Sequence, residues 1–212
     1  MPIQAQPKPK PLLLQLPGEL ALQVTPQQFV ALAAANRDLR LERSATGELI
    51  VSPPTGGTSG KRNLSPTTQL GIWFEANDSL GEAFDSSTGF ELPNGANRSP
   101  DAAWVNKARW EALTLDQQEE FIPLCPDFVV ELRSKTDSLT GLRTKMKKYI
   151  DNGTQLGWLI DPKNKRVEIY RSAQAVEILE NPSLLSGEAV LPGFTLNLRL
   201  NSYFEELVRA MT

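Results

Sequence analysis

The stretch at residues 128–133, Phe-Val-Val-Glu-Leu-Arg, carries one acidic side chain inside an otherwise apolar run. A short run of this kind predicts a β-strand, and a strand this apolar is expected to be covered on both faces of its sheet. Because side chains alternate, Glu131 would share a face with Val129, opposite Val130. A buried carboxylate is costly unless it is paired or bound to a metal, so Glu131 is a candidate functional residue.

A second acid begins another short apolar stretch. Asp101 follows Pro100, which suits the first position of a strand, and precedes Ala-Ala-Trp-Val at residues 102–105. Two carboxylates on adjacent strands repel each other, and a divalent cation between them removes that cost. Hard oxygen ligands favour Mg²⁺ or Mn²⁺. Asp101 and Glu131 are therefore predicted to bind one such cation.

The segment after Glu131 is basic, although the formal net charge of the whole chain is −3. On a predicted helix over residues 142–151, Lys145 lies at the edge of the apolar stripe, whereas Lys148 points further outward. We expect Lys145 to reach toward the sheet, and the cationic patch suits a phosphodiester substrate. Between residues 133 and 149 one acid, Asp137, opposes six cations: Arg133, Lys135, Arg143, Lys145, Lys147 and Lys148.

The chain alternates predicted helices and strands around these segments, which predicts an α/β fold with a mixed central β-sheet flanked by helices. Residues 1–24, rich in Pro, Gln and Leu, are expected to form an extended arm, and residues 25–212 a single domain. Thr25-Pro26 opens a helix, and Asn94-Gly95 predicts a hairpin. Other strands are predicted at 39–41, 49–51, 82–92, 98–105, 156–160 and 166–171, and helices at about 63–77, 107–120 and 201–210.

The composition excludes several mechanisms. There is no histidine, which removes Ser-His-Asp and Cys-His catalysis, histidine-ligated zinc and every nuclease with a histidine base. The one cysteine, Cys125, can form no internal disulfide and is expected to be a buried small residue. No run of eighteen apolar residues and no signal pattern exist, so we expect a cytoplasmic protein. Any catalysis must rest on carboxylates, lysines, arginines, hydroxyls or a metal.

The loop at residues 52–60 ends in Gly-Gly-Thr-Ser-Gly before Lys61 and looks like a phosphate-binding loop. That motif needs a glycine where Thr55 stands, and serine or threonine where Arg62 stands, so an ATPase is not expected. Two interpretations remain: a flexible turn before a helix, or a segment that contacts phosphate at a helix N-terminus, with Lys61 beside it.

Pro100-Asp101, followed by Glu131 inside a hydrophobic strand, resembles the PD-(D/E)xK nuclease superfamily. Longer stretches narrow the resemblance to the Uma-two family of restriction-endonuclease-like proteins. The similarity covers about residues 25–200. Its blocks, in the same order along the chain, lie at residues 47–57, 98–101, 126–134 and 157–162.

The resemblance implies that Asp101 and Glu131 bind the metal, while Lys145 orients or activates water and stabilises the pentavalent phosphate. Arg133 stands where the superfamily usually has its lysine, and the family supplies that lysine from the following helix, at the position of Lys145. Glu48 matches a recurrent family acid and is a candidate for completing the metal site. Spacing alone also allows a structural role, in which Asp101 caps a turn and Glu131 pairs with Arg133 or Lys145.

These arguments predict an endonuclease that hydrolyses DNA phosphodiester bonds with water activated by Mg²⁺ or Mn²⁺. Arg133, Lys135 and Lys61 are the candidate substrate-binding residues. Many nucleases of this kind cut duplexes as two-fold dimers, so a homodimer is expected. The alternatives are a catalytically inactive nuclease fold that binds DNA or another protein, and an enzyme that acts on RNA.

Overall fold

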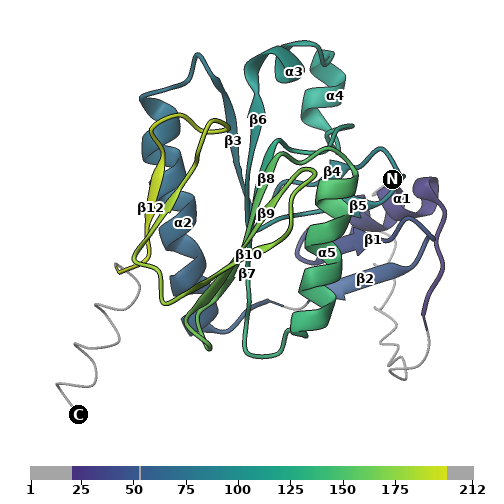
Figure 1. The fold of residues 1–212 in the computed structure, drawn as a ribbon. Helices are drawn as coiled ribbons and strands as arrows, with labels where there is room; N and C mark the ends of the chain where they lie inside the picture. Colours follow the sequence, from purple (N-terminus) through teal and green to yellow (C-terminus); the bar gives the residue numbers. More distant parts are fainter. Residues whose placement is uncertain (1–20, 53, 200–212) are drawn as a thin grey trace, which may run out of the picture.

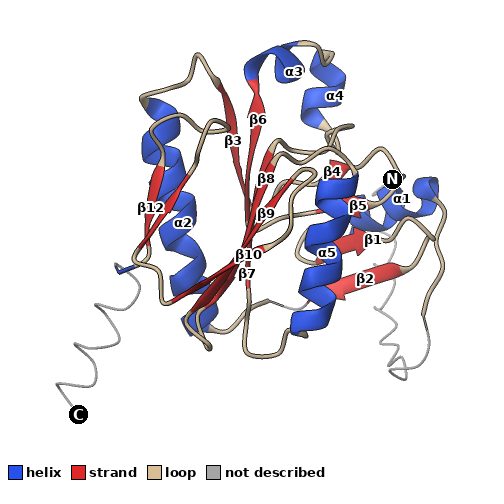
Figure 2. Ribbon diagram, in the orientation of Figure 1, coloured by secondary structure: helices blue, strands red, loops and turns tan. Residues whose placement is uncertain are grey.

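The computed structural model describes residues 21–52 and 54–199, and a six-stranded mixed sheet forms the centre of this part (Figures 1 and 2). Its strands follow the order β10-β9-β8-β7-β6-β3. Only β7 and β8 run parallel among these pairs, and a helix connects them, as parallel neighbours require. The predicted mixed α/β fold is confirmed. The strands are β3 (Gly81–Asp85), β6 (Ala102–Asn106), β7 (Phe128–Leu132), β8 (Leu156–Asp161), β9 (Arg166–Arg171) and β10 (Glu177–Glu180).

Two long helices cover opposite faces of this sheet: α2 (Gly57–Glu75) on one side and α5 (Leu139–Asp151) on the other (Figure 1). The predicted alternation along β7 is confirmed, because Val130 packs in the core that includes Leu70 of α2. Val129 packs in the other core, with Met146 and Tyr149 of α5. Glu131 therefore lies on the α5 side of the sheet.

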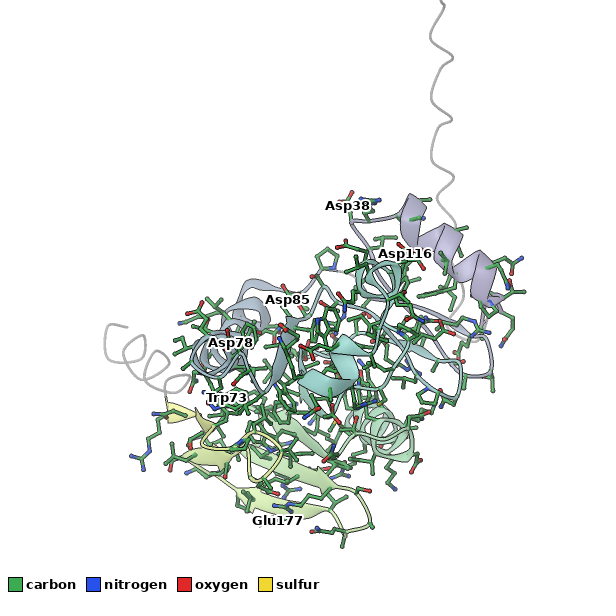
Figure 3. The ribbon with its side chains drawn as sticks, turned by 90° about the horizontal axis from the view of Figure 1, so that it is seen from above. Asp38, Trp73, Asp78, Asp85, Asp116 and Glu177 are labelled. Carbon is green, nitrogen blue, oxygen red and sulfur yellow. The ribbon has the colours of Figure 1, made fainter. Side chains whose placement is uncertain are left out.

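The α2 side is closed by a hairpin of β11 (Leu184–Ser186) and β12 (Thr195–Asn197). Trp73 of α2, labelled in Figure 3, joins the layers: its ring lies 6.2 Å from that of Trp104 on β6 and 5.7 Å from that of Phe194. These aromatic contacts fix α2 against the sheet.

A second sheet, of order β2-β1-β5-β4, lies beside α5 (Figure 1). Helix α1 precedes this sheet in the chain, and Thr25 caps its N-terminus through a capping box with Gln28. The helix start predicted at Thr25-Pro26 is confirmed. Its elements are α1 (Pro26–Ala35), β1 (Arg40–Arg43), β2 (Leu49–Ser52), β4 (Phe90–Glu91) and β5 (Asn97–Arg98).

The hairpin predicted over residues 82–105 is divided between the two sheets. Its inner strands, β4 and β5, pair around a turn in which Gly95 has a φ of +80°. Its outer strands, β3 and β6, pair with each other in the central sheet. Pro100 lies between β5 and β6. Proline has no N–H to donate to a neighbouring strand, so the single strand predicted over residues 98–105 is interrupted there. This break places Asp101 where the two sheets meet.

Other predictions are met in part. Helix α2 begins at Gly57, earlier than the predicted position near 63. The segment 107–120 forms two short helices, α3 (Lys107–Glu111) and α4 (Leu115–Glu119). The helix predicted over 201–210 and most of the predicted arm lie outside the described residues. Within the described part, no helix has the length and apolar character needed to cross a membrane.

Candidate active site

Asp101 and Glu131 lie opposite each other at one end of the central sheet. β6 and β7 pair with Ala102 across from Val130, and continuing that register by one residue puts Asp101 across from Glu131. Two hydrogen bonds join the strands here. The Asp101 amide donates to the Val130 carbonyl at 3.0 Å, and the Leu132 amide donates to the Asp101 side-chain oxygen Oδ2 at 2.7 Å. Both acids are buried, with 8% and 3% of their surface exposed.

Lys145 approaches this pair from α5. Its ammonium lies 2.7 Å from Glu131 Oε1 and 2.8 Å from Glu42 Oε1, and it also donates to the Ser99 carbonyl at 3.3 Å. The Tyr149 hydroxyl, one turn further along α5, donates to the same Glu131 oxygen at 3.1 Å. The structure thus brings together Asp101, Glu131 and Lys145, the three residues predicted to be catalytic.

Glu42 of β1 is a third buried acid in this cluster, which the sequence did not single out. Its second oxygen accepts from Arg98 at 2.9 Å, and its first accepts from the Ser99 amide at 3.0 Å. Arg40, two residues earlier on β1, donates to Asp101 Oδ1 at 3.1 Å. The site therefore contains three acids and three cations from two sheets and one helix: Glu42, Asp101, Glu131, Arg40, Arg98 and Lys145.

The two glutamates of this cluster differ in electrostatics. Burial raises the pKa of Glu131 to about 7; Lys145 opposes that rise, and the charges of Asp101 and Glu42 add to it. Burial would also raise the pKa of Glu42, but Lys145 and Arg98 hold that pKa at about 2. Glu42 is thus stabilised as a carboxylate by its two cations, whereas Lys145 only partly offsets the cost of burying Glu131.

A cavity of about 960 Å³ opens over this cluster. The acids and Lys145 line its inner part, and the N-terminal turn of α2 and the loop after β7 form two of its walls. Asp38, labelled in Figure 3, lines it from the segment between α1 and β1. The site is therefore a buried charged centre at a cavity lined by residues from the α1–β1 segment, α2, β7 and α5.

The structure separates the three predicted substrate-binding residues. Arg133 lines the cavity, but its guanidinium pairs with Asp161 of β8 at 2.7 Å rather than with Glu131. Lys135 lines the cavity from an exposed position in the loop after β7. Lys61 is exposed and is not among the residues that line the cavity, whereas its neighbour Arg62 is.

Two further placements correct the sequence analysis. Glu48 does not reach the cavity: it is exposed at the turn between β1 and β2 and forms an isolated bridge with Gln23. The third acid of the cluster is Glu42, from the other strand of that hairpin. Lys148 is half-buried and lines the cavity, although the helical wheel predicted that it faces away. The cavity wraps further around α5 than the apolar stripe indicates.

Asp101 and Glu131 have the donor chemistry for a divalent cation. They are hard oxygen ligands, and the charges of Asp101 and Glu42 add to the effect of burial in raising the pKa of Glu131. Among the described residues, no three acidic, histidine or cysteine side chains lie close enough together to hold a metal ion as a set. Mg²⁺ in enzymes is often bound through only one or two carboxylates, with water and substrate oxygens completing its shell, so the pair fits such an ion.

A family model described as "Putative restriction endonuclease", Uma2, matches residues 26–199. The chain belongs to the Uma2 family. Among solved structures it is similar to a crystal structure described as "a putative nuclease belonging to DUF820", from Anabaena variabilis, with 21% sequence identity and a TM-score of 0.64. The match covers 77% of this chain and 90% of that one, so the Uma2 chain shares the fold of that protein. No curated protein matches the chain.

Proposed function

We propose that this Uma2 protein is a metal-dependent endonuclease that hydrolyses DNA phosphodiester bonds, with Asp101 and Glu131 as the metal ligands and Lys145 as the catalytic cation. The observation that carries the proposal is the burial of two carboxylates opposite each other on β6 and β7, with the ammonium of Lys145 2.7 Å from Glu131. The family and the fold independently favour nuclease chemistry.

The main chain and Arg40 orient the proposed ligands. The Leu132 amide fixes one oxygen of Asp101 and the Arg40 guanidinium holds the other, so this carboxylate has little freedom to rotate. Mg²⁺ or Mn²⁺ bound here would lower the pKa of water and neutralise charge on the substrate phosphate. Fixed ligands matter because preorganised charges need no rearrangement during the reaction.

Lys145 would stabilise the negative charge that develops on the phosphate oxygens when water attacks. Its ammonium is already inside the site, held between Glu42 and Glu131. Burial lowers the pKa of Lys145, but the two glutamates raise it above its ordinary value, so the side chain remains a cation at neutral pH. Glu42 acts through Lys145, as a positioning residue.

The test uses the purified full chain with a closed circular DNA, a linear DNA and a mixed-sequence RNA, each with Mg²⁺, Mn²⁺ or EDTA. We expect cleavage of the circular DNA with either metal and none with EDTA. Because a closed circle has no ends, its cleavage identifies an endonuclease. Cleavage of RNA alone would move the substrate assignment to RNA. No cleavage under any metal condition would overturn the proposal.

The second candidate function is a non-catalytic nuclease fold that binds DNA or another protein. It is favoured by the charge balance of the cluster, in which three acids already lie against three cations. The two functions differ in one measurement: a binding module retains DNA affinity when it cuts nothing. We also expect a homodimer, since two-fold pairing lets two sites act on the two strands of a duplex; sedimentation of the full chain tests this.

A further inference from the structure

One side of α5 forms a wall of the cavity. Four of the five α5 residues that line it are Gly141, Thr144, Lys145 and Lys148. Their spacing of three, four and seven residues defines a single helical face. Lys147 lies outside this set: it is exposed and does not line the cavity. This face carries two cations, and one of them, Lys145, forms ion pairs with Glu42 and Glu131.

The side-chain amines of Lys135 and Lys148 are unpaired in the part of the chain that the structure describes. Within the ranges 21–52 and 54–199, neither amine has an ion pair or a hydrogen bond, yet both residues line the cavity. Four other cations that line the cavity differ, because Arg40, Arg98, Arg133 and Lys145 each contact a carboxylate of the protein. Two lysines are thus available to a negatively charged ligand.

These lysines lie on opposite sides of Lys145 in the sequence, and both line the same cavity. Lys148 is three residues beyond Lys145, a rise of about 4.5 Å. Lys135 precedes Ser138, the N-cap of α5, and so lies before the start of the helix. All three lysines line one cavity, so a nucleic-acid strand in it with one phosphate at Lys145 would have both unpaired amines available to its other phosphates.

The rest of the lining has the same chemistry. Among the lining residues that the structure describes, none is aromatic, whereas many carry hydroxyls. Aromatic side chains are the stacking platforms for unpaired bases, while lysines, hydroxyls and helix N-termini contact phosphate and sugar. The N-cap of α2, Gly56, makes no side-chain cap, and the turn that follows lines the cavity. The hydroxyl residues are Ser52, Thr55, Thr58, Ser59, Ser86, Ser134, Thr136 and Thr144.

We infer that this cavity recognises the sugar-phosphate backbone of DNA independently of base sequence, with Lys135 and Lys148 binding phosphates other than the one at Lys145. This inference rests on the proposed function for its choice of substrate, and it adds how that substrate is held. It predicts that affinity depends on salt and on neither the bases nor their order.

The experiment measures binding of the full chain to two labelled duplexes of unrelated sequence over a range of KCl concentrations, in EDTA. The variants are Lys135→Ala and Lys148→Ala, and Lys147→Ala is the matched control on the same helix. Each contact to B-DNA contributes about −0.9 to the slope of log K against log salt. We expect Lys135→Ala and Lys148→Ala each to make this slope less negative by about 0.9, equally for both duplexes. Lys147→Ala should have the slope of wild type.

Several outcomes overturn the inference: no DNA binding by wild type, unchanged slopes in both Lys135→Ala and Lys148→Ala, or a change of slope in Lys147→Ala as large as in those two variants. A tenfold preference of wild type for one duplex would also overturn it. If Lys148→Ala does not fold, Lys148→Gln replaces it, since a neutral side chain of similar length removes only the charge. Because binding is measured without metal, the inference is separable from the proposed function. Wild type that binds as expected but cuts nothing refutes only the proposed function, and an active enzyme with unchanged variant slopes refutes only the inference.

Discussion

Two buried acids at opposite ends of β7 have different surroundings. Asp127, just before the strand, is 1% exposed and accepts hydrogen bonds from the Asn106 amide, Arg109 and Gln155, each at 2.8 Å. Glu131, four residues later, is 3% exposed and lies beside two other acids. Asp127 is not among the residues that line the cavity, whereas Glu131 is.

Asp127 has the surroundings of a structural acid, and Glu131 those expected of a metal ligand. Both carboxylates are buried away from solvent, so burial alone does not distinguish a structural role from a functional one. What differs is the sign of the neighbouring groups: the side chain of Asp127 is contacted by donors alone, while that of Glu131 has donors on one side and carboxylates on the other. The raised pKa of Glu131, its neighbours of both charges and its position in the cavity lining together indicate the candidate active site.

The largest expected effect is on catalysis at the Glu131 end. Lys145→Ala should slow single-turnover cleavage of DNA with Mn²⁺ by about 10²- to 10³-fold, because it removes the cation held beside Glu131. Arg133→Ala should stay within about tenfold of wild type, since its guanidinium pairs with Asp161. If Arg133→Ala is inactive and Lys145→Ala cuts normally, the assignment of the catalytic cation is wrong.

The next effect is on stability at the Asp127 end. Asp127→Ala should lower the free energy of unfolding by about 3 kcal/mol, because three part-buried hydrogen bonds to one buried, charged acceptor are lost. For a domain of this size, that is a decrease of about 6–12 °C in melting temperature. Glu119→Ala, at an exposed acid in α4, is the control and should change stability by no more than about 0.5 kcal/mol. Equal stability of the two variants would refute the structural role of Asp127.

Sequence reasoning identified Asp101, Glu131 and Lys145 because their placement follows from local rules. Alternation along β7 puts Glu131 on one face, and the wheel of α5 puts Lys145 at the edge of the buried stripe. The placements of Glu131 and Lys145 each needed only one element and its period, whereas the roles assigned to Asp101, Glu131 and Lys145 came from the family resemblance and remain predictions. The mixed sheet followed similarly, from the order of apolar runs and turn residues.

The sequence did not identify Glu42, because its burial comes from tertiary contacts. Arg40, Glu42 and Arg43 are charged residues within one short strand, which gives no apolar alternation to indicate a buried face. Glu42 is buried only because Arg98, Ser99 and Lys145 meet there, from another strand, a loop and a helix. Nor can a helical wheel show that Lys148 lines the cavity, since the opposite wall comes from other parts of the chain.

A smaller effect compares Glu131 with Glu42. The folded-state pKa of Glu131 is about 7, above its ordinary value, so the ionised acid disfavours folding and stability falls as pH rises toward 7. Glu131→Gln should therefore stabilise the metal-free protein at pH 8 by about 1–3 kcal/mol, with most of that gain gone at pH 5. Glu42 has a pKa of about 2, below its ordinary value, so its stabilising contribution is present above pH 4.5 and is lost as pH falls toward 2.

Denaturant unfolding in EDTA at pH 5 and pH 8 measures both variants. Glu42→Gln should destabilise the protein at pH 8, where Glu131→Gln stabilises it, since Arg98 and Lys145 lose the charge of their shared acceptor. Destabilisation by both variants would mean that Glu131, like Asp127, is held for stability. That result would remove the electrostatic distinction between the two ends of β7.

The smallest expected effect is that of metal on stability, and it tests the comparison most directly. A ligand that binds only the folded state at ten times its Kd stabilises by about 1.4 kcal/mol, or about 3–6 °C in melting temperature. We expect Mn²⁺ to produce such a shift in wild type and in Asp127→Ala, each measured against its own value in EDTA. The double variant Asp101→Asn with Glu131→Gln should show none, because amide oxygens carry no charge to attract the ion. Lys145→Ala should keep the shift or enlarge it, because it removes a positive charge 2.7 Å from Glu131. A shift that persists in the double variant would place the metal elsewhere, and a shift lost in Asp127→Ala would mean that the two ends of β7 do not act independently.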